Sequence, residues 1–233
     1  MLLVLCWLAL GSPLQNARAD AASMAKAVEA RYAHAQTLQA QFYERYHGGG
    51  SGGQAESGIV FFSKPGRMRW EYESPEQKLF VVDGKNVWFY VPADRTASRA
   101  TVKESEDWRT PLSLLTGKIH LDRLCGQMEL LDEATGTSSP ADLPYDPRNR
   151  ILRCLPHKSS EPNVQEAFRE ILFEVSPEAD LARVVIREPG DVETEFRFGN
   201  WKENMPLPES IFHFEPPAGV TIVNEEDLAK GLH

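Results

Sequence analysis

Two tight apolar hairpins follow each other between residues 58 and 90, and they constrain the fold more than any other part of the chain. The first hairpin turns at Pro65-Gly66. A two-residue turn there places Phe61 opposite Trp70 on an almost wholly apolar face, while the charged side chains of both strands take the other face. The sequence therefore predicts a sheet with one buried, apolar face and one polar face.

The second hairpin turns at Asp83-Gly84, and alternation along its strands assigns its large apolar side chains to one face. Together the two hairpins predict one apolar surface formed by Phe61, Met68, Trp70, Tyr72, Leu79, Val81, Trp88 and Tyr90. Such side chains usually form a packed core, because closed small barrels fill themselves with side chains. The surface needs either that core or an apolar ligand to fill it.

The first 19 residues have the features of an export signal. An apolar run from Leu2 to Leu10 is followed by Ala17-Arg18-Ala19, an A-x-A cleavage pattern, before Asp20. The run is too short to span a bilayer as a permanent helix. We expect cleavage after Ala19, which leaves residues 20–233 as one exported domain.

The formal net charge of −9 argues against a nucleic-acid partner and against adsorption to anionic lipid heads. Outside the signal, two cysteines remain, Cys125 and Cys154. In an exported chain they are consistent with a disulfide or with two buried thiols, since the sequence does not supply their separation.

Two helices interrupt an otherwise strand-rich pattern. The segment from Asp20 to Ala35 has apolar residues at helical spacing, and Thr110 to Gly117 begins with Thr-Pro and is rich in leucine. The remainder alternates as about eleven strands, with a long loop between residues 134 and 150 and a late strand over residues 210–215. We expect a mainly β (α+β) fold, an unclosed and strongly curved antiparallel barrel with a helical lid formed by Met24, Val28, Leu112 and Leu115.

Residues that could carry catalysis or hold a metal are few. The tract from Gly49 to Gly53 matches the G-x-S-x-G pattern around Ser51, but a second strand follows it where a nucleophile elbow needs a helix. The six histidines form no close ligand pair such as H-E-x-x-H. We expect no enzyme, no cofactor and no metal, with an esterase at Ser51 as the remote alternative.

Several ordered motifs resemble the LolA family of periplasmic outer-membrane lipoprotein carriers. They are the run from Gly58 to Tyr72, then Ser74-Pro75, Val82-Asp83-Gly84-Lys85, Val87 to Pro92 and Thr110-Pro111-Leu112. Thr37 to Phe42 and Phe214 to Val220 are similar to that family too, whereas residues 132–150 are not part of the resemblance.

The resemblance implies a monomeric periplasmic carrier whose apolar interior holds the acyl chains of a lipoprotein. The carrier would take its cargo from an inner-membrane ABC transporter and pass it to an outer-membrane acceptor. Family members often have an arginine before the turn proline, which holds the lid through helix carbonyls, and this chain has Lys64 there. A lipid or glycolipid carrier, or a domain that senses lipoproteins, is the alternative within the same fold.

Overall fold

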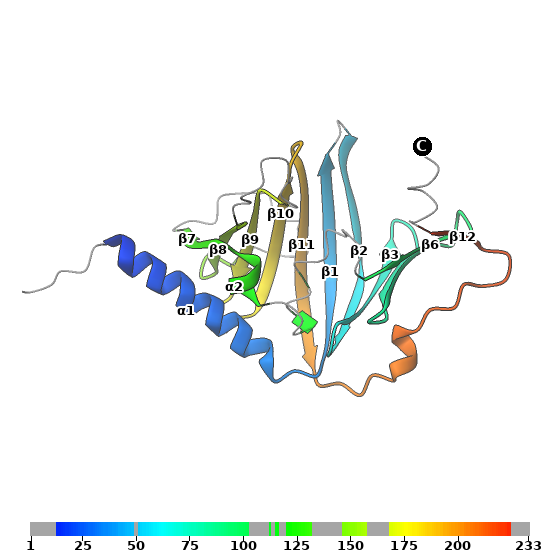
Figure 1. Ribbon diagram of the computed structural model, residues 1–233, viewed down its shortest axis with the longest axis horizontal. Coiled ribbons are helices and arrows are strands. Elements are labelled where there is room, and N and C mark those ends of the chain that lie inside the picture. Colours follow the sequence, from blue (N-terminus) through cyan, green and yellow to red (C-terminus); the bar gives the residue numbers. More distant parts are fainter. Residues whose placement is uncertain are drawn as a thin grey trace, which may run out of the picture.

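One curved sheet dominates the computed structural model, which describes residues 13–48, 51–102, 112, 115–116, 120–131, 146–157 and 168–224 (Figure 1). The helices are α1 (Pro13–Ala33), α2 (Leu121–Leu124) and the 3-10 helix η2 (Glu209–Phe212). The strands are β1 (Thr37–Gly48), β2 (Ser51–Ser63), β3 (Arg67–Ser74), β4 (Lys78–Val82), β5 (Asn86–Val91), β6 (Thr96–Thr101), β7 (Gln127–Leu131), β8 (Arg150–Leu155), β9 (Glu170–Val175), β10 (Leu181–Glu188), β11 (Val192–Glu203) and β12 (Thr221–Asn224).

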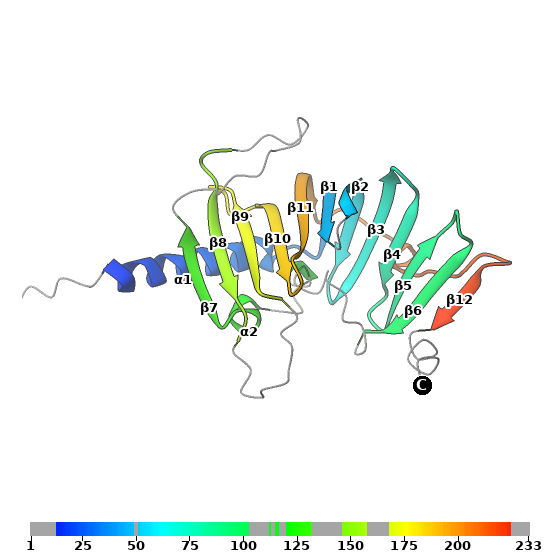
Figure 2. The same cartoon turned by 90° about the horizontal axis from the view of Figure 1, so that it is seen from above.

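The twelve described strands form a single sheet in the order β12-β6-β5-β4-β3-β2-β1-β11-β10-β9-β8-β7. All neighbours are antiparallel except β12, which runs parallel to β6. The edge strands β7 and β12 lie at opposite ends of the molecule, so the sheet does not close on itself (Figure 2). This confirms the predicted unclosed, mainly β architecture.

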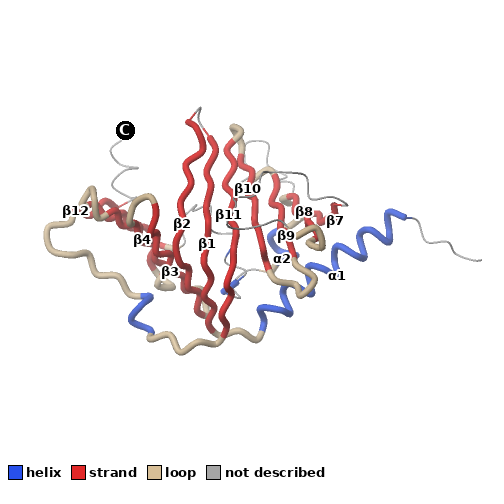
Figure 3. The backbone as a smooth tube through the Cα atoms, turned by 180° about the vertical axis from the view of Figure 1, so that it is seen from behind, coloured by secondary structure: helices blue, strands red, loops and turns tan. Residues whose placement is uncertain are grey.

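The central strands β1, β2 and β11 are the longest, with 12, 13 and 12 residues (Figure 3). Their inward residues and those of α1 belong to one apolar core, and we call the face of the sheet that carries this core the inner face. Helix α1 contacts β7 and β8 and buries Val28 and Tyr32. Leu112 and Leu115 are buried in the same core.

The predicted pairing of the first hairpin is wrong by one residue. Ser63 pairs with Arg67, so Lys64, Pro65 and Gly66 form a three-residue loop in which Gly66 adopts a φ of +70°. A shift of one residue exchanges the faces of a strand. Val60 and Phe62 of β2 therefore accompany Trp70 on the inner face, and Phe61 pairs with Arg69 on the outer face.

The second hairpin keeps its predicted grouping but on the other side of the sheet. Val82 pairs with Val87, a shift of two residues that preserves the faces. Trp70 pairs with Phe80, so Phe80, Val82 and Val87 line the inner face. Four residues predicted to share a surface with Trp70 lie on the outer face instead: Leu79, Val81, Trp88 and Tyr90.

The C-terminal segment covers this outer apolar patch. The ring of Phe214 lies 5.5 Å from that of Trp88 and 5.3 Å from that of Tyr90, and Val220 packs against the same cluster. Arg69 Nη1 donates to the carbonyl of Ile211 at 2.8 Å and so fixes the start of the segment. Residues 209–212 form η2, so the strand predicted over residues 210–215 is wrong, because this segment packs across the sheet and pairs with no neighbour until β12.

The remaining predictions of helices and strands agree with the structure only in part. Helix α1 is longer than the predicted segment 20–35 because it begins at Pro13, whereas residues 1–12 lie outside the described residues. The short helix predicted at residues 110–117 and the loop at 134–150 also lie mostly outside them. Strand β7 was not predicted. Residue 51 begins β2 within a hairpin, whereas an esterase elbow requires a turn from a strand into a helix.

The outer face of β8 to β11 and β1 carries a network of ion pairs. Glu195 is 1% exposed and binds Arg45 Nη2 at 2.6 Å and Arg197 Nη2 at 2.9 Å. Arg183 lies 3.5 Å from Glu195 and donates to Glu174 at 2.7 Å, which links this cluster to the next strand. Except for Arg45, which is partly exposed, these arginines and glutamates are buried, although their alternation in the sequence is typical of a solvated face.

A second group of ion pairs on the same face centres on Glu170 of β9. Although burial raises the pKa of the Glu170 carboxyl, hydrogen bonds from Arg187 and Arg153 outweigh that effect, so the pKa lies below its ordinary value. The carboxylate is therefore held in its charged form between two guanidinium groups.

Cys125 and Cys154 form a disulfide, with their Cα atoms 5.2 Å apart. Cys125 follows α2, and Cys154 lies on the inner face of β8. The bridge thus ties the short helix to the sheet, and it decides between the two alternatives that the sequence left open.

Replacing both cysteines, Cys125→Ala with Cys154→Ala, should lower the free energy of unfolding by about 3 kcal/mol. The bridge closes a loop between residues that are 29 apart in sequence, and its loss frees the unfolded chain. Urea unfolding of the oxidised wild type and the variant measures the difference. The reduced wild type serves as the control and should approach the variant, whereas equal stability of all three forms would contradict the prediction.

Candidate functional site

The inner face carries a cluster of six aromatic side chains drawn from four strands. Trp70 lies at its centre and is fully buried, with ring centroids of Phe42 at 4.8 Å and Phe196 at 5.4 Å. The remaining members are Phe62, Phe198 and Tyr72. Edge and tilted ring contacts of this kind stabilise the cluster beyond the burial of area. Of the predicted acyl-chain surface, Met68, Trp70 and Tyr72 therefore lie together here.

The predicted lid residues lie on the same side of the sheet. Val28 is 1% exposed, Leu112 and Leu115 are fully or almost fully buried, and all three belong to the core that contains Trp70. Met24 is partly buried and packs against that core. Helical segments therefore cover the inner face with apolar side chains, in the arrangement that the predicted lid requires.

Lys64 connects this cover to the sheet. It is the first residue of the loop between β2 and β3, and its Nζ donates to the carbonyls of Tyr32 and Ala33 at 2.7 Å each. These are among the last carbonyls of α1, which have no partner within the helix, and the helix dipole favours a cation at this end. Burial lowers the pKa of the Lys64 ammonium. The contact is the one that the latch hypothesis needs.

A second link holds the same end of α1. The backbone N–H of Leu181 donates to the hydroxyl of Tyr32 at 2.9 Å, and the Tyr32 ring lies 5.6 Å from that of Trp201. Burial raises the pKa of the Tyr32 hydroxyl. Arg31 pairs with Asp180 at 2.8 Å and with Glu203 beside it. The C-terminal turn of α1 is thus anchored to β10, β11 and the residue before β10, as well as to Lys64.

The buried carboxylate of Glu44 lies on the inner face. Glu44 is 6% exposed and accepts a hydrogen bond from the Tyr72 hydroxyl at 2.7 Å. Tyr72 reaches it across Gly58, where an added Cβ would lie 1.9 Å from the carbonyl oxygen of Glu71. Glycine is required there because β3 approaches β2 too closely for any side chain. Glu44 was not predicted from the sequence, although it continues the two-residue spacing of the inward positions that end at Phe42.

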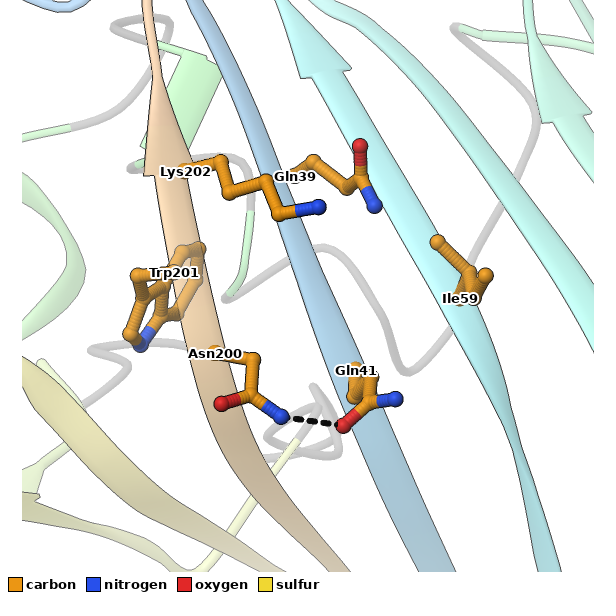
Figure 4. A pocket seen from close by; sticks show the side chains of 6 residues that line it. All are labelled: Gln39, Gln41, Ile59, Asn200, Trp201 and Lys202. Carbon is orange, nitrogen blue, oxygen red and sulfur yellow. Dashed lines mark hydrogen bonds between the residues drawn. The ribbon is translucent and has the colours of Figure 1, made fainter.

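A pocket of about 430 Å³ opens on the other side of the central strands (Figure 4). It is lined by Gln39, Gln41, Ile59, Asn200, Trp201 and Lys202. Asn200 donates to Gln41 across a bulge between β1 and β11, at which Asn200 has a φ of +54°. Its lining combines three amides and a lysine with the apolar side chains of Ile59 and Trp201. No helix among the described residues is long and apolar enough to span a membrane.

Fold and site together define a class: open, strongly curved antiparallel sheets whose apolar inner face is covered by helical segments. Residues 33–132 match the family described as outer membrane lipoprotein carrier protein LolA. The resemblance to the LolA family is thereby confirmed, since the match to its model covers residues 33–132.

Named relatives extend the likeness over most of the chain. The outer-membrane lipoprotein carrier protein of Nitrosomonas europaea is 29% identical over 171 residues, which cover 72% of this chain and 73% of that protein. The protein of the same name from Xylella fastidiosa is 27% identical over 216 residues, covering 92% and 91%. Among solved structures, an uncharacterized conserved protein from Thermus thermophilus shares the fold, with a TM-score of 0.50 at 13% identity, covering 88% of this chain and 99% of that protein.

Proposed function

We propose that this protein is a periplasmic carrier of lipoproteins, with residues 20–233 as one carrier domain that acts as a monomer after cleavage at Ala19. It would receive acylated lipoproteins from an inner-membrane ABC transporter and deliver them to an outer-membrane acceptor. The observation that carries the proposal is the inner face, where an aromatic cluster around Trp70 is covered by helical segments instead of a second sheet within the described residues. The likeness to named lipoprotein carriers supports it.

Release of the acyl chains to an acceptor would need no external source of energy. Burial of an acyl chain contributes about 0.8 kcal/mol per methylene, which would make release slow if the empty face met water. In the closed form Val28, Leu112 and Leu115 already occupy the inner face. Cargo and cover therefore exchange places at a small difference in buried apolar area, and a slightly better acceptor can withdraw the chains.

The cover must move for cargo to enter, and Lys64 is the residue we assign to control that movement. Replacing Lys64 by leucine removes two hydrogen bonds to α1 and should raise the open population about fivefold, which corresponds to about 1 kcal/mol. Hydrogen exchange at the amides of α1, measured by mass spectrometry, should accelerate accordingly.

Lys64→Arg provides the matched control, since its guanidinium can donate to the same carbonyls and should keep the exchange slow. Release of a bound acylated peptide should be faster in the leucine variant than in the arginine variant. Unchanged exchange and unchanged release in Lys64→Leu would exclude a latch at this position.

Site-specific crosslinking tests the function itself. A photoreactive amino acid at position 62 faces inward and one at position 90 faces outward, because Phe62 belongs to the inner core and Tyr90 to the outer patch. We expect an acylated lipoprotein to crosslink at position 62 and its non-acylated form to crosslink at neither position. Crosslinking of both forms alike, or only at position 90, would refute carriage on the inner face, and recovery of a free lipid alone would indicate a lipid carrier.

A further inference from the structure

One end of the inner face is polar. Along β1 the inward residues run from Phe42 through Glu44 to Tyr46, and the exposed fraction of the side chain rises to 44% at Tyr46. On β11 the facing residues run from Phe198 through Phe196 to Thr194. The apolar cluster around Trp70 therefore gives way to polar groups where the inner face meets solvent.

Thr194 is the unusual member of this end. It is 1% exposed, and its hydroxyl has no hydrogen-bond partner in the part of the chain that the structure describes. It pairs with Tyr46 on one side and with Ile186 on the other, so it lies on the inner face. Buried hydroxyls nearly always have a partner, because leaving them without one is unfavourable. A hydroxyl in this state fits a ligand atom that accepts a hydrogen bond.

Glu44 supplies the complementary group. Because Glu44 pairs with Phe196, it is the diagonal neighbour of Thr194, at a distance of roughly 7–8 Å between backbones. The Tyr72 hydroxyl binds Glu44 Oε2 and fixes the orientation of the carboxylate. A carboxylate has about four acceptor positions and, when charged, donates nothing. This end of the site therefore presents an acceptor on one strand and a hydroxyl on the next.

We propose that Glu44 and Thr194 form a subsite for the amide that joins an acyl chain to its peptide, a refinement that rests on the proposed function. A trans amide has its N–H and its carbonyl on opposite edges, so one amide can donate to Glu44 and accept from Thr194 at once. The acyl chain then extends toward Trp70, and the peptide leaves past the exposed Tyr46. An ester offers the same carbonyl but no N–H, so the subsite discriminates between the two linkages.

Two matched probes test this assignment. The first is palmitate linked through an amide to the peptide Gly-Ser-Gly-Ser, and the second carries glycolate in place of the first glycine, so that an ester replaces the amide. Calorimetric titration of the wild type should show about tenfold tighter binding of the amide probe, as expected for one hydrogen bond to a carboxylate.

Variants then assign the preference to the residues. In Glu44→Gln the neutral amide oxygen is a weaker acceptor, so the preference should fall to about threefold or less. Thr194→Val is nearly isosteric and should weaken both probes about fivefold, whereas Thr194→Ser should retain wild-type affinity because it keeps the hydroxyl. Circular dichroism confirms that each variant is folded before titration.

The outcomes separate this inference from the proposed function. Equal binding of both probes to the wild type, or a preference that survives Glu44→Gln undiminished, overturns the amide subsite and leaves acyl carriage standing. Failure of both probes to bind, while both remain soluble, refutes carriage on the inner face and the subsite with it.

Discussion

Replacing Glu195 by alanine should lower the free energy of unfolding by about 3–5 kcal/mol, a large part of the stability of an ordinary domain. This carboxylate is 1% exposed and lies within 2.6 to 3.5 Å of guanidinium groups from three strands, those of Arg45, Arg183 and Arg197. Its removal leaves two buried cations, Arg183 and Arg197, and the partly buried Arg45 without the anion that they share, and that desolvation is costly. Urea denaturation followed by tryptophan fluorescence measures the loss.

An exposed ion pair of the same sheet provides the control. Asp191 binds Arg169 at 2.5 Å, but its side chain is 94% exposed. Asp191→Asn keeps a residue type that tolerates the φ of +58° at this position, and it should change the free energy of unfolding by less than about 1 kcal/mol. If Glu195→Ala and Asp191→Asn had similar effects, the burial of the network would not determine its contribution to stability.

The burial of this network marks a limit of the sequence analysis. Charged residues at every second position, such as Glu193, Glu195 and Arg197, indicate a strand whose charged side faces water. In the structure Glu195 and Arg197 are buried, because the arginines and glutamates of adjacent strands satisfy one another across the sheet. Such pairing depends on which strands are neighbours, and the local pattern of residues does not determine the order of the strands.

The aromatic faces show a second limit, with a definite physical origin. Alternation correctly separates the residues of β4 and β5 into two sets, but the loop after Ser63 has three residues where two were predicted. That single residue exchanges Phe61 for Phe62 on the inner face. It cannot be inferred from composition, since Phe61 and Phe62 are identical side chains and β2 presents apolar residues to both faces of the sheet.

Other features of the site were predicted. The resemblance to the LolA family implied the role of Lys64, and the structure brings its Nζ to two helix carbonyls. The apolar positions of the helical segments, Val28, Leu112 and Leu115, are buried in the core as their spacing predicted. Glu44 and Thr194 were not predicted, because a single polar residue in a strand gives no periodic signal. Only the register of β1 with β11 places them together.

Trp70→Ala should lower the free energy of unfolding by about 3–5 kcal/mol, because the variant loses the burial of the indole and leaves a cavity. Trp70 is fully buried among Phe42, Phe62, Phe196 and Phe198, with ring centroids at 4.8 to 6.2 Å. Rigid strands carry all four rings, so the site can collapse only in part. Urea unfolding monitored by circular dichroism avoids dependence on the missing fluorophore.

Tyr46→Ala is the matched control, since Tyr46 lies on the same face but is 44% exposed. This substitution should lower the free energy of unfolding by less than about 1 kcal/mol.

The Trp70→Ala variant also tests whether the aromatic cluster is only a packed core or a site that holds acyl chains. If the cluster holds acyl chains, the palmitoylated amide peptide should raise the unfolding midpoint of Trp70→Ala at least as much as that of the wild type, because the chain fills the space that the indole leaves. A ligand that stabilises neither protein would make the cluster an ordinary core, with cargo bound elsewhere.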